Sequence, residues 1–405
     1  MDRPGKTLQE CCRLIAGSAK RAAKNSGAQC AAQPVLFSPG TMLRLWIESA
    51  FRVPSKQQSF RKPILFIYIF SLFFHLVLAC YGFFNRRSVI FVAFSFVFVF
   101  VVAAFRFDVG VDFKSYVRIF DALASSSESY GHTEPGFNFL VFFLDYFGFG
   151  YQSIFFVFAF FTSYFFYKYI KYFSVNVPFS IFVYVSFPIF YLATFNQIRQ
   201  FLAVAMFAYS LRFVVENRFL KFFTFIVLAG FFHKSAFVII LVYPFLMLKP
   251  SLASYSFVFL IYLFVLGFSE FFLFDVLGFT RRYLEPGSQG NIFLFFAFFF
   301  VFFIVCCFVK DKRYNVFVNL VFFAVIIMAT PFLSSYPQAE VMRIGSYFTI
   351  SLIVLVPYIM EIISPSRFKL IYFFLICFFL SFYYIFTLLV NGEAYNLVPY
   401  YFYGY

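Results

Sequence analysis

VIFVAFSFVFVFVVAAF at residues 89–105 is followed directly by RFDVGVDFKSY at residues 106–116, and this pair of stretches decides the class of the protein. The first stretch has no charged residue and is long enough for a helix that crosses hydrocarbon. The second contains two acids and two bases, in a chain of which only 12% is charged. We interpret it as part of a polar site just outside a membrane span, rather than as a solvated loop.

The composition excludes a water-soluble fold. Of 405 residues, 63% are hydrophobic, and the mean hydropathy is +0.87, which leaves too little charged surface to cover a soluble domain. A β-barrel is excluded because its strands alternate apolar and polar residues, whereas these apolar runs are continuous. The sequence therefore predicts an all-α polytopic membrane protein. The formal charge of +15 is attributed to cytoplasmic loops, not to nucleic-acid binding.

Two regions differ in composition. Residues 1–62 are small, polar and basic, and we expect a poorly ordered tail there, or a true start nearer Met42. Residues 63–405 form the predicted membrane domain. About 12 spans are expected there, at 63–84, 88–105, 152–170, 178–195, 198–216, 219–232, 235–248, 251–268, 291–309, 314–331, 346–363 and 368–390. The apolar piece 137–149 is too short to span and is predicted to be re-entrant or interfacial.

The basic residues orient this arrangement. Short loops such as Arg86-Arg87 and Lys310-Asp-Lys-Arg313 hold more Lys and Arg than the opposite set, which indicates that they are cytoplasmic. The longer loops 106–150, 269–290 and 332–345 then face outside. This parity also puts the basic tail outside, which conflicts with the same rule, and we give more weight to the many downstream loops.

Three acids in the first outer loop are candidates for general-base chemistry. Asp108 and Asp112 are four residues apart, and Glu134 precedes Pro135-Gly136 at a turn. A carboxylate near the membrane surface can accept a proton from a sugar hydroxyl. The alternative is structural, since Asp112 precedes a helical pattern and Glu134 sits at a helix start, where acids cap helices.

Basic groups at the edges of spans are candidates for anion binding. Arg199 lies about one turn inside a span, beside Asn196, Gln197 and Gln200, and a charge at that depth usually has a partner or a cavity. Its alternative is an arginine that snorkels to lipid headgroups. His233 interrupts an apolar stretch, either as a turn residue or as a phosphate contact. Arg343 either pairs with Glu340 or binds phosphate.

No metal or cofactor is expected. The chain has 3 His and 7 Cys, without a CxxC, HExxH or DxD pattern, and without a P-loop or GxGxxG motif. Chemistry that depends on ATP or on a nucleotide sugar therefore has no support in the sequence.

At these motifs the chain resembles the EpsG-like family of Wzy-type polysaccharide polymerases. The resemblance rests on short pieces in the family's order: VGVDFKSY (109–116), EPG (134–136), FNQIRQFLA (195–203), FHKSA (232–236), RIGSY (343–347) and VPY (398–400). It covers roughly residues 63–405 and leaves out the tail.

The resemblance implies a glycosyltransferase of the bacterial cytoplasmic (inner) membrane, with a GT-C-like helix arrangement and a site that faces the periplasm. Such a protein transfers a growing glycan from undecaprenyl pyrophosphate to a hydroxyl of another lipid-linked unit, without a metal, to make an O-antigen or exopolysaccharide. Its partners would be the lipid-linked oligosaccharide, membrane lipids, a flippase and a chain-length regulator.

Roles follow if that resemblance holds. Asp112 is expected to be the base, with Asp108 or Glu134 as alternates. The expected donors to the pyrophosphate are Arg106, Arg199, His233 and Arg343. The expected supporting residues are Tyr116, Asn196, Gln200 and Tyr347.

Three rival functions stay open. A flippase or transporter of lipid-linked glycans would need charges in mid-span and internal repeats, and no clear repeat is present. A membrane acyltransferase would need a histidine with an acid partner; His75 is followed four residues later by Ala79. A structural assembly protein would make the polar clusters incidental.

Overall fold

A computed structural model describes residues 65–84, 89–126, 133–268, 292–333, 338–363 and 366–404. The chain divides into two units, Met1–Ser49 and Ala50–Tyr405, and all the described residues belong to the second. The predicted tail 1–62 and the predicted outer loop 269–290 lie outside the described residues, as does part of the loop 332–345.

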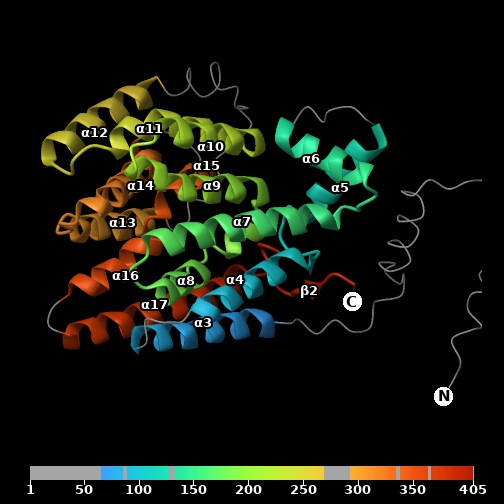
Figure 1. Cartoon of the computed structure of the whole chain (residues 1–405), viewed down its shortest axis with the longest axis horizontal. Coiled ribbons are helices and arrows are strands. Elements are labelled where there is room, and N and C mark those ends of the chain that lie inside the picture. Colours follow the sequence, from blue (N-terminus) through green and yellow to red (C-terminus); the bar gives the residue numbers. More distant parts are fainter. Residues whose placement is uncertain are drawn as a thin grey trace, which may run out of the picture. The chain divides into compact units, whose positions relative to one another are not determined.

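Apart from two short strands, the regular elements of the described residues are helices (Figure 1). The first half contains α3 (Phe66–Phe84), α4 (Val89–Ala104), β1 (Arg106–Phe107), α5 (Phe113–Ser126), α6 (Pro135–Tyr146), α7 (Gln152–Phe173), α8 (Val177–Ser186), η1 (Leu192–Phe195) and α9 (Ile198–Val215). The second half contains α10 (Phe219–Phe232), η2 (Lys234–Phe237), α11 (Val238–Leu246), α12 (Leu252–Gly267), α13 (Ile292–Cys306), η5 (Lys312–Tyr314), α14 (Asn315–Leu333), α15 (Gln338–Thr349), α16 (Leu352–Ile362), α17 (Ser366–Asn391) and β2 (Tyr401–Phe402).

Five helices are long and apolar enough to cross a membrane by themselves, and the pair α15 and α16 makes a sixth if it is one bent span. The five are α3, α7, α9, α14 with η5, and α17, and shorter apolar helices accompany them. The chain is therefore a polytopic α-helical membrane protein, as predicted. Each of the predicted spans overlaps at least one helix, but several helices are shorter than the predicted span.

Two predicted spans are interrupted in the structure. The range 178–195 holds α8, which ends at Ser186 close to Pro188, and the chain then turns into η1. A proline disfavours helix in the residue before it and cannot donate a backbone hydrogen bond, which explains the stop. The range 346–363 holds the end of α15 and all of α16, which are bent by 43° at a short break.

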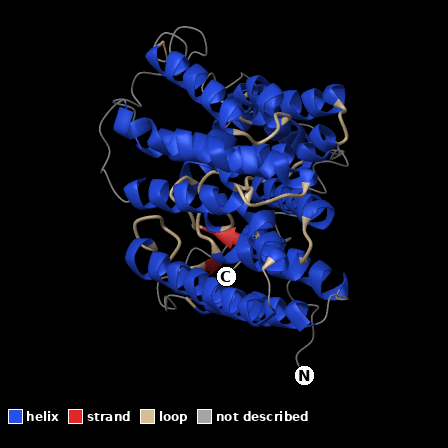
Figure 2. Ribbon diagram, turned by 90° about the vertical axis from the view of Figure 1, so that its left-hand side faces the viewer, coloured by secondary structure: helices blue, strands red, loops and turns tan. Residues whose placement is uncertain are grey.

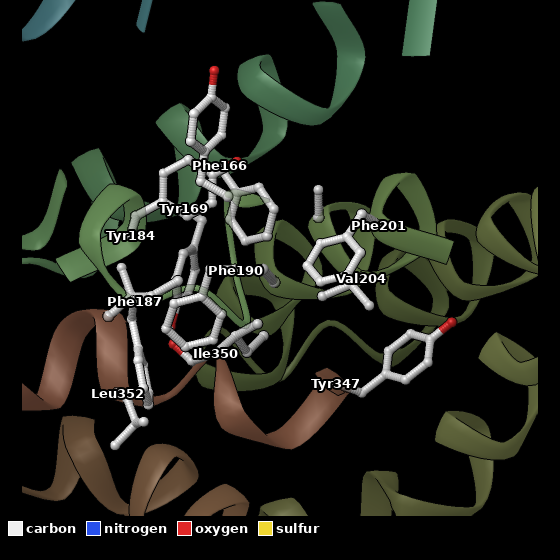
Figure 3. Close-up of a cluster of buried hydrophobic side chains, with 14 of the residues drawn as sticks. Phe166, Tyr169, Tyr184, Phe187, Phe190, Phe201, Val204, Tyr347, Ile350 and Leu352 are labelled. Carbon is white, nitrogen blue, oxygen red and sulfur yellow. The ribbon is translucent and has the colours of Figure 1, made fainter. Parts of the chain in front are cut away.

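Helix α9 is at the centre of the bundle. In the apolar 18-residue segment of α9, 78% of the residues are buried, against 33% in that of α17. Helix α9 packs closely on α7 and α10. Small residues such as Ala203, Ala205 and Ala208, all fully buried, permit that close approach. Figure 3 shows the aromatic layer beside α9, where Phe201 and Val204 lie near Tyr347 and Ile350. A rigid, dry support of this kind can hold a charged side chain in one orientation.

The C-terminal segment returns to the end of α4. Strand β2 pairs antiparallel with β1, with Arg106 opposite Phe402 and Phe107 opposite Tyr401, and Figure 2 shows this pair enclosed by helices. The Tyr400 hydroxyl donates to the Val102 carbonyl over 2.5 Å. Helices α5 and α6 lie at the same end of the bundle as β2 (Figure 1), and we name this end the α5–α6 end.

Candidate functional site

The carboxylate of Glu134 is the hub of a polar cluster at the α5–α6 end. It forms a salt bridge with Nη1 of Arg199 through Oε2. Its other oxygen, Oε1, lies 3.2 Å from Nδ1 of His233 and accepts a hydrogen bond of 3.4 Å from the backbone N–H of Lys234. Three elements far apart in sequence, α6, α9 and the α10–η2 junction, therefore meet at one side chain.

Each of these side chains sits where a helix begins or ends. Glu134 is the N-cap of α6, extended because Pro135 follows it. Arg199 is in the first turn of α9. His233 is extended between the last residue of α10 and the first of η2. At these boundaries the side chains stay partly exposed, 12% for Glu134, 20% for Arg199 and 25% for His233.

Aromatic rings hold the Arg199 guanidinium in place. Its Cζ lies 5.7 Å from the ring centre of Tyr116 and 5.4 Å from that of Phe137, within the range of cation–π attraction. Only 20% of the Arg199 side chain and 12% of the Glu134 side chain is exposed. Burial alone would raise the pKa of Glu134, but His233 and the charge of Arg199 outweigh it and hold this pKa below its usual value.

Asp112 has a different environment from Glu134. Burial raises the pKa of its carboxyl above the usual value, and the charges of Arg343 and Arg199 partly oppose that shift. Among the described residues, no hydrogen bond or salt bridge engages its carboxylate. Asp112 is thus a half-buried acid next to cations, with its oxygens open to a ligand.

Helix α15 is tied to this cluster by its backbone and hydroxyls. The amide Nε2 of Gln200 donates to the Arg343 carbonyl over 2.5 Å and to Oγ of Ser346 over 3.0 Å. The Tyr347 hydroxyl lies 3.0 Å from Oγ of Ser235, two residues after His233. These bonds fix the segment that carries Arg343 against α9 and η2. The alternative partner Glu340 has a side chain outside the described residues.

Two asparagines fix the loop that carries Asp112. Oδ1 of Asn196 accepts a hydrogen bond of 2.6 Å from the Val111 N–H. Nδ2 of Asn396 donates to the carbonyl of Asp108 over 2.9 Å, and the Gly110 N–H donates to the Asn396 carbonyl over 2.7 Å. Gly110 has φ +98°, and a Cβ there would lie 2.2 Å from the Phe195 carbonyl oxygen, so this turn requires glycine.

The structure brings Asp112, Glu134, Arg199 and His233 together, with Tyr116, Asn196, Gln200, Arg343 and Tyr347 around them. It does not bring Asp108 in, since that carboxylate pairs with exposed Lys114 at 3.2 Å. Arg106 is also apart: it is 2% exposed, between the rings of Phe155 and Phe195. It lines a cavity of about 10 Å³, room for about one water and too small for a phosphate.

Two residues in contact with this cluster or with the loop that carries Asp112, Phe137 and Asn396, were not singled out from the sequence alone, whereas Ser235 belongs to the quoted FHKSA motif. Asn396 has φ +48°, and an asparagine in a short polar tail gives no local signal of such a contact. The flanking motif VPY at 398–400 was the available hint. Among the described residues, no group of three or more His, Cys, Asp or Glu is arranged to hold a metal ion.

One comparison with known proteins gives a match. The model of the EpsG family matches residues 89–402, which is more than half of the chain and includes every residue of the cluster. No curated protein and no solved structure matches the chain.

Proposed function

This chain belongs to the EpsG family, and from that premise we propose that it joins lipid-linked oligosaccharide repeat units into a polysaccharide. The family and the apolar helices identify a membrane protein of polysaccharide-polymerase type. The proposed substrate is a polyprenyl-diphosphate glycan, and the proposed reaction is transfer of that glycan to a sugar hydroxyl.

The observation that supports it most strongly is the meeting of Arg199, His233 and the Lys234 N–H at the Glu134 carboxylate. Asp112 is near enough for the charges of Arg343 and Arg199 to lower its pKa. The donor substrate is a glycan on a polyprenyl diphosphate, of which undecaprenyl is the proposed lipid. When the bond between the anomeric carbon and the diphosphate oxygen breaks, negative charge grows on the diphosphate. Hydrogen-bond donors fixed at that position, among them the charged guanidinium of Arg199, stabilise the transition state.

Asp112 is the proposed general base. The acceptor is a hydroxyl of the terminal sugar of a second lipid-linked unit. As its oxygen bonds to the anomeric carbon, its proton passes to the Asp112 carboxylate. The bond to the polyprenyl diphosphate breaks, and Arg199, His233 and Arg343 bind the leaving diphosphate. A raised pKa suits this role, because a base is most effective when its pKa approaches the working pH. Arg106 and Asp108 are not part of this proposed site.

The membrane arrangement is part of the proposal. We place the α5–α6 end outside the bacterial cytoplasmic membrane, in a GT-C-like arrangement of about 12 crossing or dipping segments. The opposite end of α9 carries Arg212, and Arg218 and Lys221 follow at the start of α10, as expected for a cytoplasmic side. A flippase that delivers the units and a protein that limits chain length are the proposed partners.

The test is chain growth by the purified protein in lipid nanodiscs with a synthetic polyprenyl-diphosphate repeat unit. We expect a ladder of longer lipid-linked glycans without nucleotide. Transfer of the unit across a vesicle bilayer without lengthening would instead identify a flippase, and no ladder from folded protein would refute the proposal. Labelling of single cysteines placed at Ser115 and Ser235 tests whether both face the outside.

A further inference from the structure

The Glu134 carboxylate occupies a place that is built for a larger anion. It faces a guanidinium, an imidazole and a backbone N–H from two different elements. The N-terminus of α9 adds its positive dipole end, since Arg199 is in the first turn. A carboxylate offers two oxygens to these donors, whereas a phosphate group offers three and more charge.

The carboxylate also leaves one donor unused. Nε of Arg199 is buried and forms no hydrogen bond among the described residues, whereas Nδ1 of His233 already faces Oε1 of Glu134 at 3.2 Å. Buried donors without partners are costly, and in native proteins they point to an absent ligand or water. The cluster is thus incompletely satisfied by the protein's own acid.

Glu134 can leave without loss of its helix. It is the N-cap of α6, but its side chain makes no capping hydrogen bond, and Pro135 starts the helix without needing a donor partner. Its carboxylate contacts Arg199, His233 and the Lys234 N–H and not the backbone of α6. A change of side-chain rotamer would free Arg199 and His233 while the backbone stays in place.

From these contacts we infer that Glu134 is a placeholder, which keeps the diphosphate subsite filled until the diphosphate of the lipid-linked substrate displaces it. This inference rests on the proposed function and adds the position of the diphosphate and a competitor for it. The empty enzyme thereby avoids an unpaired, part-buried arginine, and the substrate must break the Glu134 contacts before it binds. The apparent affinity of the subsite is reduced accordingly.

The two possible roles of Glu134 predict opposite changes in anion affinity when its charge is removed. If Glu134 only holds Arg199 and His233 in position, removing its charge loosens these two side chains and weakens anion binding. If it is a competitor, removing its charge strengthens anion binding. Glu134→Gln separates the two, because glutamine keeps the shape and one acceptor oxygen but loses the charge-assisted bond to Arg199.

The experiment measures the affinity of inorganic pyrophosphate, and of sulfate as a second anion, for the full chain in nanodiscs by calorimetry. We expect Glu134→Gln to bind pyrophosphate about tenfold more tightly than the wild type, the size expected for losing a competing charged contact. Glu216→Gln is the matched control, since Glu216 pairs with Arg212 at the other end of α9; its affinity should equal that of the wild type. Arg199→Gln should lose binding in either background.

Weaker or unchanged pyrophosphate binding by Glu134→Gln overturns the inference, as does the absence of binding in both proteins. Glu134→Asp provides a second variant, which keeps the charge but is shorter by one methylene. If the shorter carboxylate no longer reaches Arg199, this variant should bind pyrophosphate more tightly than the wild type. Chain growth by the wild type in the same nanodiscs is measured in parallel. If the wild type makes a glycan ladder but Glu134→Gln binds pyrophosphate more weakly, only the placeholder role is rejected. If the wild type makes no ladder, the proposed function itself is rejected.

Discussion

Helix α9 carries an arginine paired with a glutamate at each end, and the two pairs are built differently. At the far end, Arg212 pairs with Glu216 one turn on, at 3.4 Å, and Arg218 contacts the same glutamate at 3.2 Å. At the α5–α6 end, Arg199 pairs with Glu134 from 65 residues earlier in the chain. The first pair is a product of helix geometry, while the second exists only in the folded protein.

The pairs also differ in what else they contact. Arg212 lies over Tyr172, Tyr209 and Phe213 in a cluster closed by the Tyr172 hydroxyl, which donates to Glu216. Both pairs leave the arginine Nε buried without a hydrogen-bond partner among the described residues. The Arg199 pair differs in that a further half-buried carboxylate, Asp112, lies near enough for the charge of Arg199 to lower its pKa. Local pairs of the first kind contribute little to stability, typically below about 1 kcal/mol. This difference supports the proposal that the reaction takes place at the α5–α6 end of α9.

The largest expected effect concerns the acids at the two ends. Asp112→Asn removes the proposed base and should lower the rate of chain growth by about 10²–10⁴, the usual contribution of a positioned base. Glu216→Gln should leave the rate within about twofold, because Glu216 pairs with Arg212 at the other end of α9, away from the proposed site. Both rates are measured as glycan ladders at saturating lipid-linked donor. Equal rates for Asp112→Asn and the wild type would remove Asp112 from the reaction.

Substitution of the arginines at the two ends of α9 should change kcat by almost as different amounts. Arg199→Gln should reduce kcat by about 10²–10³, as for the loss of one transition-state donor, while Arg212→Gln changes it little. Arg199→Gln also leaves Glu134 with a part-buried charge and fewer partners, which destabilises the fold. The double variant Arg199→Gln with Glu134→Gln separates the effects: it should regain thermal stability without regaining activity. Recovery of chain growth in that double variant would contradict a role for Arg199 in the reaction.

The pH dependence gives a smaller but more specific effect. Asp112 works only when ionised, so activity falls as the pH drops through its pKa, and burial puts that pKa above the usual aspartate value. The charge of Arg343 lowers this pKa, and so Arg343→Gln should raise it and move the acid limb of the rate profile to higher pH. Arg218→Gln at the far end should leave the limb in place. A limb that moves to lower pH in Arg343→Gln would show that Asp112 is not the titrating group.

The sequence predicted the helices better than the site. Long apolar runs located α3, α7, α9 and α17 within a few residues. Hydropathy did not reveal where the chain changes direction inside an apolar run, so the breaks near Pro188 and between α15 and α16 were missed. An apolar residue has the same hydropathy in a helix and in a bend.

The site was predicted as a set of residues and not as an arrangement. Arg199 stood out as a charge inside a predicted span, His233 as an interruption of an apolar stretch and Glu134 as an acid at a turn. Nothing in their spacing indicates that they share one contact. In the sequence, Arg106 beside an apolar run looked like an arginine that donates hydrogen bonds to a phosphate. In the structure its guanidinium lies between the rings of Phe155 and Phe195. Local sequence records polarity, whereas tertiary packing decides which polar groups meet.

The smallest expected effect tests how far the α5–α6 end depends on the C-terminal segment. Asn396→Ala removes the donor to the Asp108 carbonyl and should lower stability by about 1 kcal/mol, as for one hydrogen bond. Because the Gly110 bond to the Asn396 carbonyl is made by backbone, the loop should loosen rather than unfold, with kcat reduced several-fold at unchanged donor KM. Asn391→Ala, in the last turn of α17, is the control, and it should not alter kcat. An unchanged kcat in Asn396→Ala at reduced thermal stability would mean that this asparagine supports the fold alone, and that Asn196 suffices to position the loop of Asp112.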